Sequence, residues 1–220
     1  MFPMSYSLRL LYQDGQLLIV HKPAGWTIYA EDGVPKDQHL QSVCEDLFAQ
    51  KLFPVHRLDR GTCGIVVFAT DGRWARELHE QFSGRRVDKT YLALVEGEIK
   101  KTQRIDIALK EKGKGEQSAL TVLKPRKSSI LHGEPVTLVE LHPETGRFHQ
   151  LRKHCKLIGH ALIGDTTYGR RSGKINEGER LMLSAIGLNF SHPRTRKELK
   201  IVDTPDSEFV ALAKTAGLSV

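Results

Sequence analysis

The sequence predicts an α+β protein with one extended, mixed but largely antiparallel sheet flanked by helices. Hairpin signals are the first observation: two apolar runs in residues 8–23 are separated by an Asp-Gly pair, and Pro23 ends the second run. Second, β-branched runs bounded by turn formers recur along the chain, whereas segments with helical spacing are few. Third, the 220 residues contain no internal repeat, low-complexity tract or linker, so we expect one domain over residues 1–220.

Two helices and two strands are expected after the first hairpin. Apolar residues recur at helical spacing in residues 40–53, which predicts a helix with one core-facing stripe. Residues 64–70 are almost continuously apolar and indicate a buried strand. A helix is then expected over 71–82, with Asp71 as its N-cap, and a strand over 89–97.

The remaining elements continue this pattern. Residues 101–145 favour further strands joined by loops, a helix then ends at Gly159, and a second hairpin precedes a terminal amphipathic helix. The expected ranges are 118–125 and 135–143 for strands, 149–159 for the helix, 180–193 and 197–203 for the hairpin, and 206–218 for the last helix.

The composition describes a basic globular protein. The chain has 33 Lys and Arg against 26 Asp and Glu, a formal net charge of +7 and a pI near 9.3. This excess favours an anionic partner, with nucleic acid first, although a role in solubility alone would account for the charge equally well. The three cysteines lack the paired spacing of a disulfide framework, which suits a reducing cytoplasm. A secretory leader and a long apolar run are both missing, so we expect no membrane association.

The sequence does not match the common cofactor-binding and metal-binding motifs. The stretch "GRRSGKI" at 169–175 has too few residues between its glycines for a phosphate-binding loop and is interpreted as a basic surface loop. Dinucleotide binding has no support, because no G-x-G-x-x-G follows a strand. His149 and His154 are five residues apart, not the four that aligns two ligands on a helix face. We therefore expect neither cofactor nor metal.

Four polar clusters remain: "HRLDR" (56–60), "KTY" (89–91), "TGRFHQLRKH" (145–154) and "GDTTYG" (164–169). Each has an ordinary structural explanation. Asp59 could cap a turn, Tyr91 could place its ring in the core, and Asp165 could bond its own backbone. Arg147 and Arg152 could form a solvated helix face.

Taken together, the clusters are similar to those of a known enzyme family. The stretch "HRLDRGTCG" at 56–64 resembles the H-R-L-D-x-x-T-S-G-like loop of pseudouridine synthases of the RluA branch. Further matches follow in family order in "KTYLALVEG", in residues 145–169 and in "RLMLSA". The resemblance runs from "YQDGQLLIVHKPAGW" to "HPRTRKELKI" and implies the pseudouridine synthase catalytic fold with a central cleft.

The resemblance also implies roles for single residues. Asp59 would be the essential carboxylate, acting as a nucleophile on base or sugar or as the base that abstracts a ribose proton; the sequence leaves these routes open. Arg152 would be the cation that keeps Asp59 ionised, and Tyr91 would stack on the flipped uracil and help remove its C5 proton. Arg57 would enter the RNA stack as the uridine leaves it. The remaining expected substrate-binding residues are His56, Arg60, Arg147 and Leu181.

The family pattern is not followed everywhere. Gly61 and Cys63 stand where proline and serine are common, Phe148 where threonine is usual, and Ser184 where histidine is usual. None of these changes removes a proposed catalytic group. The chain begins close to the first hairpin, so we expect no separate N-terminal RNA-binding domain.

The expected partner is RNA, and the protein is expected to act as a monomer. Basic stretches at 110–117 and 168–174 would hold phosphates, or would simply be solvated loops. Within the branch the chain resembles tRNA-modifying members most. A ribosomal RNA substrate and a non-catalytic RNA-binding protein of the same fold are the alternatives. Glycoside hydrolysis would need a second carboxylate, and Asp165, the other candidate, is interpreted as structural.

Overall fold

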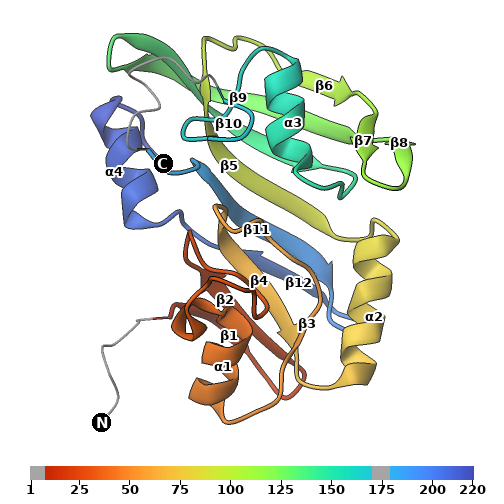
Figure 1. Ribbon diagram of the computed structural model, residues 1–220. Helices are drawn as coiled ribbons and strands as arrows, with labels where there is room; N and C mark the ends of the chain where they lie inside the picture. Colours follow the sequence, from red (N-terminus) through yellow and green to blue (C-terminus); the bar gives the residue numbers. More distant parts are fainter. Residues whose placement is uncertain (1–7, 170–178) are drawn as a thin grey trace.

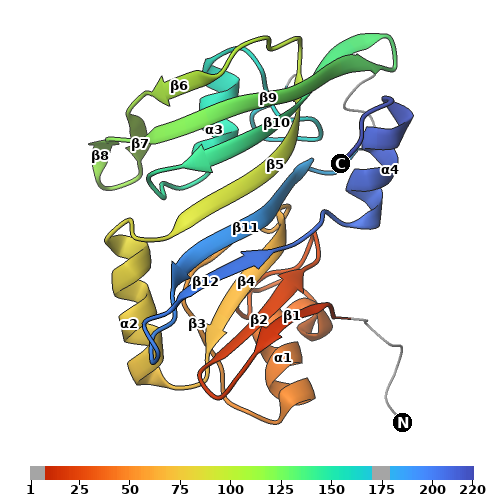
Figure 2. The ribbon, with the colours of Figure 1, turned by 180° about the vertical axis from the view of Figure 1, so that it is seen from behind.

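The fold is organised around a ten-stranded sheet, seen from its two sides in Figures 1 and 2. The computed structural model describes residues 8–169 and 179–220. The main strand order is β1-β2-β4-β11-β5-β10-β9-β6, with β12 beside β11 and β3 beside β4, while β7 and β8 form a small separate sheet. The predicted α+β class and the largely antiparallel sheet are confirmed.

The strands are β1 (Leu10–Gln13), β2 (Leu17–Lys22), β3 (Phe53–Pro54), β4 (Cys63–Ala69), β5 (Asp88–Glu96), β6 (Gln103–Asp106), β7 (Leu109–Glu111), β8 (Gly115–Gln117), β9 (Leu120–Leu131), β10 (Glu134–Pro143), β11 (Leu183–Ser191) and β12 (Glu198–Val202). The helices are a short 3-10 helix (Lys36–Gln38), α1 (Leu40–Phe48), α2 (Gly72–Ser83), α3 (Gln150–Leu157) and α4 (Ser207–Thr215).

Strand β11 brings distant parts of the chain together. It runs parallel to β4, where Ser184 is opposite Cys63, and antiparallel to β5, where Ala185 is opposite Tyr91. The close approach of β4 to β11 explains why glycine follows Cys63: Gly64 has φ +114°, and a Cβ there would lie 2.2 Å from the carbonyl oxygen of Ala185. The loop that precedes β4 is thereby placed beside β5.

Helices pack on both faces of the sheet. Figure 1 shows α1 and α3 in front of the strands, and Figure 2 shows α4 beside the upper strands on the other side. Side chains of neighbouring residues in β5 point to opposite faces of the sheet, as expected from strand geometry. Val95 packs in the cluster that contains Cys155 of α3, whereas Leu94 packs with Phe209 of α4. The apolar cores therefore lie on both sides of the central strands.

The predicted elements are all present, and several boundaries differ, three of them for reasons that the structure shows. The helix predicted over 40–53 ends at Phe48, because Ala49 adopts a left-handed conformation and Phe53 pairs with β4. The strand expected to stop at Pro125 continues to Leu131, since the pairing with β10 shifts by one residue and accommodates the proline. The predicted helix 149–159 is shorter, because His149 is a left-handed N-cap.

Two further sequence predictions concern caps and membrane segments. Asp71 caps α2 as predicted, accepting a hydrogen bond from the Arg73 amide at 2.7 Å. Among residues 8–169 and 179–220, the structure contains no helix with the length and apolarity required to cross a membrane.

Candidate active site

A cleft of about 1000 Å³ lies where the loop before β4 faces α3. Its walls come from that loop, from the last turn of α2, from β5 and β11, from the β7–β8 hairpin and from the loop that enters α3. The sequence-predicted residues that line it are His56, Arg57, Asp59, Tyr91, Arg147 and Arg152. Residues from three separate parts of the chain, 56–59, 91 and 147–152, are thus gathered around one cavity, which agrees with the expected central cleft.

The loop that carries Asp59 is held in place by buried side chains and by hydrogen bonds from Lys22. Val55 and Leu58 are buried, so the loop is fixed to the core on both sides of the exposed Arg57. The wholly buried ammonium of Lys22 donates to the carbonyl oxygens of Trp26 at 2.8 Å and Arg60 at 3.1 Å. Burial lowers the pKa of Lys22 to about 7. The sequence analysis missed this lysine, whose only signal was a charge at the end of an apolar strand.

Asp59 faces two nitrogen-bearing side chains of the opposite wall. One carboxylate oxygen lies 3.8 Å from Nη1 of Arg152 and 3.7 Å from Nε2 of His149. The Asp59 side chain is 22% exposed, so it is held in the wall yet reachable from the cleft. The predicted pairing of Arg152 with Asp59 thus has a geometric basis, at ion-pair rather than hydrogen-bond distance.

Arg152 is held mainly by Asp165. Its Nε and Nη2 each donate a 2.8 Å hydrogen bond to the two oxygens of the Asp165 carboxylate. Burial alone lowers the pKa of Arg152, but the bonds to Asp165 and the charges of Asp165 and Asp59 raise it overall. The guanidinium is therefore a permanent positive charge with a fixed orientation beside Asp59.

Asp165 has the structural role that the sequence suggested and one that it did not. One carboxylate oxygen accepts from the amides of Thr167 at 3.0 Å and Tyr168 at 2.9 Å, as expected for an acid that closes its own turn. Burial raises the pKa of Asp165, yet the bonds from Arg152 and these amides lower it overall. The bidentate bond to Arg152 was not predicted, because the two residues lie on different elements.

His149 lies between Asp59 and Tyr168 and contacts both. It has φ 55°, a left-handed conformation that costs free energy for a residue with a side chain. Its Nδ1 lies 3.1 Å from the hydroxyl of Tyr168, while Nε2 faces Asp59. Burial and the positive charge of Arg152 lower the pKa of His149 against the opposing effect of Asp59, which favours a neutral ring. The sequence analysis considered this histidine only as a metal ligand.

Tyr91 forms the floor of the cleft on β5. It packs against the apolar clusters on both sides, including Leu183 of β11 and Ala185. Burial, and then the negative charge of Asp59, raise the pKa of Tyr91. The ring is therefore a neutral phenol with an apolar body at neutral pH.

Basic residues surround the cleft mouth. Arg57 is exposed, and Arg147 donates from Nε to the carbonyl oxygen of Ser118 at 3.0 Å. The basic stretch 110–117 forms the β7–β8 hairpin, and its three lysines line the cleft: Lys110, Lys112 and Lys114. Residues 170–174 of the other stretch, and most of "GRRSGKI", lie outside the described residues.

Three expected substrate-binding residues have other partners. His56 lines the cleft, but its Nε2 accepts from the Val67 amide at 3.0 Å and its ring stacks on Phe82. Burial lowers the pKa of His56 to about 3, so it is a neutral wall residue. Arg60 turns to the carbonyl oxygen of Gly25 at 3.0 Å, away from the cleft lining.

Leu181, another expected substrate-binding residue, is not part of the cleft lining. It packs in the core and against Gly61, where an added Cβ would be 3.2 Å from the leucine side chain. The apolar residue that lines the cleft is Leu183, two positions later. Because Leu183 is the first residue of β11, the wall begins where the strand begins.

Within residues 8–169 and 179–220, one group of side chains has donor atoms spaced closely enough for a metal. A nitrogen of His21, the sulfur of Cys63 and an oxygen of Asp206 all lie within 4.8 Å of one another. Each group already has a protein partner: His21 bonds Asp203 at 2.6 Å, Asp206 pairs with Arg180 and caps α4, and Cys63 reaches the Leu183 carbonyl at 3.7 Å. These contacts explain the cluster as part of the packing behind the cleft.

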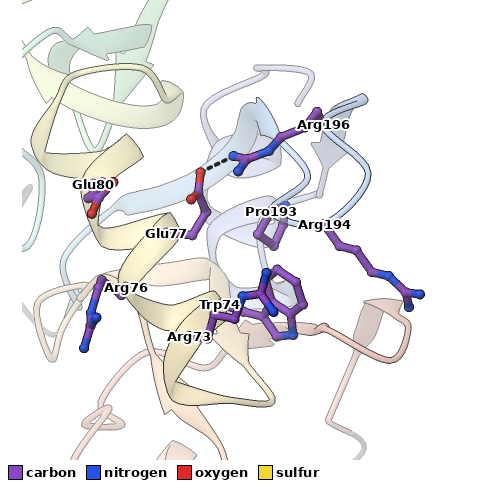
Figure 3. Close-up of a pocket in the computed structure, with 8 residues that line it drawn as sticks. All are labelled: Arg73, Trp74, Arg76, Glu77, Glu80, Pro193, Arg194 and Arg196. Atoms are coloured by element: carbon purple, nitrogen blue, oxygen red, sulfur yellow. Dashed lines mark hydrogen bonds and ion pairs between the residues drawn. The ribbon is translucent and has the colours of Figure 1, made fainter.

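A second hollow, of about 570 Å³, lies beside other residues of α2 (Figure 3). Figure 3 shows Arg196 paired with Glu77 and Arg73 stacked near Trp74, whose ring centre is 4.7 Å from the guanidinium carbon. Arg76 and Arg194 point away from each other in this view. Since its charged groups are paired or divergent, this hollow is less suited than the cleft to hold a small polar group.

Comparison with known proteins identifies the class of protein to which this fold and cleft belong. Residues 16–157 match the family described as RNA pseudouridylate synthase. The chain belongs to this family, and it is an enzyme that isomerises uridine in RNA to pseudouridine.

Several known proteins are similar over almost the whole chain. The tRNA pseudouridine synthase C of Haemophilus ducreyi is 35% identical over 234 residues, covering 96% of both chains. The protein of the same name from Vibrio vulnificus is 36% identical and covers 88% of this chain and 89% of its own. The solved structure of Human RNA Pseudouridylate Synthase Domain Containing 1 has 31% identity and a TM-score of 0.80, covering 98% of this chain and 90% of that chain. The expected family and its catalytic fold are thereby confirmed.

Proposed function

We propose that the chain modifies a uridine of tRNA, with Asp59 as the catalytic carboxylate. The observation that carries this proposal is the placement of Asp59, Tyr91 and Arg152 around one cleft, with Arg152 3.8 Å from Asp59. The names of the bacterial relatives favour tRNA over ribosomal RNA as the substrate.

The reaction needs a carboxylate that is ionised and correctly placed. The bond from N1 of uracil to the ribose breaks, the base turns, C5 bonds to the same ribose carbon, and the C5 proton is lost while N1 gains one. As nucleophile or as base, Asp59 must carry a negative charge at the start. The Arg152 guanidinium favours that charged form, and the bidentate bond to Asp165 stops the guanidinium from collapsing onto the carboxylate.

Tyr91 and Arg57 would act on the base and on the gap that it leaves. The neutral ring of Tyr91 offers an apolar surface on which uracil can stack. Arg57 lies two residues before Asp59 and is exposed at the cleft, where a flat guanidinium can enter a base stack. Flipping exposes the glycosidic bond, which is inaccessible inside a duplex.

Binding of the rest of the tRNA would rest on charge. The lysines of the β7–β8 hairpin and Arg147 lie along one side of the cleft and are suited to phosphates. The proposal includes a monomer that acts as a single catalytic domain. A cytoplasmic location is compatible with three buried free thiols and with a tRNA substrate.

Mapping of pseudouridine in total RNA, from cells with and without the gene, tests this proposal. We expect one or a few tRNA positions to lose the modification, and to regain it with the wild-type gene but not with an Asp59→Asn variant that accumulates normally. A lost position in ribosomal RNA would replace the tRNA assignment. Full rescue by Asp59→Asn would remove Asp59 from the mechanism.

A further inference from the structure

Phe148 is an aromatic side chain in the cleft that the proposed chemistry does not use. It lines the cavity, yet 55% of its surface remains exposed to solvent. A large apolar side chain gains free energy when it leaves water, so a ligand that covered this ring would gain affinity from the contact.

The ring is held in a fixed position. The Phe148 amide donates a 3.0 Å hydrogen bond to the Glu111 carboxylate, which ties this loop to the β7–β8 hairpin. One face of the ring stacks on His149, with 3.7 Å between ring centres and 20° between planes. His149 is in turn held by Tyr168. His149 therefore covers one face of the ring, and the exposed remainder of Phe148 belongs to the lining of the cleft.

The charges around Phe148 indicate what kind of group would cover it. The Lys153 ammonium is 5.3 Å from the ring centre, and Arg147, Lys112 and Lys114 line the same cavity. Glu111 is the acid on this side, and it is engaged by the Phe148 amide and by Lys114 at 3.8 Å. A flat ring surrounded by cations is suited to a nucleobase with its phosphate, because the base stacks and the phosphate is neutralised.

The distance to the reacting centre indicates which nucleotide this would be. His149 lies between Phe148 and Asp59. Its ring stacks on Phe148, and its Nε2 is 3.7 Å from a carboxylate oxygen of Asp59. We propose that the free side of Phe148 stacks on a nucleobase of the substrate RNA adjacent to the uridine that enters at Asp59. This inference rests on the proposed function.

Fluorescence of 2-aminopurine, which is quenched by stacking, tests the proposal. Two RNA stem-loops each carry one loop uridine, with 2-aminopurine on its 5′ side in one and on its 3′ side in the other. The full chain carries Asp59→Asn so that the RNA stays unreacted. We expect quenching of one of the two probes on binding. Adding Phe148→Leu should abolish the quenching and weaken binding of that probe by roughly 5- to 150-fold, the range for loss of one stacked base.

Matched variants separate stacking from folding. Phe148→Trp should keep quenching and affinity, whereas Tyr29→Leu, the same kind of change at a 47% exposed ring outside the cleft lining, should alter neither. Phe148→Thr is a second variant without the aromatic ring, to be used if the leucine variant is unfolded at the assay temperature. The proposal is overturned if neither probe is quenched, or if a folded Leu or Thr variant quenches and binds as the parent does.

Failure of this inference can be told apart from failure of the proposed function. Turnover of tRNA by the wild-type chain without quenching of either probe would overturn the Phe148 site and leave the proposed function intact. Quenching that depends on Phe148, in a chain that forms no pseudouridine in tRNA, would support the stacking site and overturn the proposed substrate.

Discussion

Replacing Asp165 by asparagine separates the support of Arg152 from the catalytic carboxylate. The Asp165 side chain is 0% exposed and that of Arg152 is 10% exposed, so their two 2.8 Å bonds lie in a poorly solvated place. Removing one partner of a buried ion pair costs about 3–5 kcal/mol, because the other charge stays behind. Asparagine keeps one oxygen for the Thr167 and Tyr168 amides, so we expect the lower end, about 3 kcal/mol. For a chain of this size that loss lowers Tm by about 6–12 °C.

The same change should slow catalysis. With Asp165→Asn the Arg152 guanidinium loses one of its two acceptors and is drawn toward Asp59, the nearest remaining charge. Because misplacement of a reacting group by about 1 Å costs up to about 100-fold in rate, we expect a single-turnover rate between about 10- and 100-fold lower. The rate is measured at saturating enzyme by release of the C5 hydrogen as tritium.

The pH dependence gives a further check on the pair. The folded-state pKa of Asp165 is lowered below its ordinary value of 3.8. Its stabilising contribution is therefore present above that value and is lost as the pH falls through the folded-state pKa. Urea unfolding should show the full difference between wild type and variant at pH 7 and a smaller one under strongly acidic conditions.

A control and a refuting result complete the test of Asp165. Asp46→Asn makes the same charge change at an exposed position of α1 and should leave both stability and rate near wild type. If Asp165→Asn unfolds within about 0.5 kcal/mol of wild type, the level expected for an unimportant surface site, the reasoning from the buried pair is refuted.

Three other predictions concern RNA and cofactors. Arg57→Lys should slow turnover of a structured stem-loop far more than that of a short unstructured RNA, because only the former needs a base displaced from a stack; equal slowing of both would show that Arg57 does not act in flipping. Lys112→Ala should lower the slope of log affinity against log salt by roughly 0.7 to 0.9, whereas Arg194→Ala in the hollow of Figure 3 should not; the reverse pattern would move the RNA to that hollow. Activity should survive exhaustive chelation and need no added nucleotide, and loss with EDTA that one metal restores would contradict this.

Local pattern was enough to predict most of the helices and strands of this fold, though not β3 or the 3-10 helix. Asp71 begins α2, the Asp-Gly pair closes the first hairpin, and helical spacing marks α1, because each signal acts within a few residues. The predicted boundaries were wrong where contacts between distant parts of the chain determine where an element ends. Pro125 would end an isolated strand, but pairing with β10 absorbs it.

The site was predictable only in part. The family resemblance singled out Asp59, Tyr91 and Arg152, and the structure brings all three to one cleft. It could not indicate that Arg152 is held by Asp165, or that Leu183 lines the cleft in place of Leu181, since both depend on distances between separate elements. Lys22 was missed for a similar reason: a buried ammonium that binds carbonyl groups leaves no periodic signal.

The position of β11 between β4 and β5 has a consequence for folding during synthesis on the ribosome. Strands β4 and β5 leave the ribosome long before their shared neighbour, which spans Leu183–Ser191 and contacts both. Such non-local pairing makes folding slow and dependent on late-synthesised residues. A nascent chain that already carries Asp59, Tyr91 and Arg152 therefore lacks the strand that sets them at their working separation. We expect the chain to remain inactive toward ribosomal RNA and toward tRNA until β11 has been synthesised.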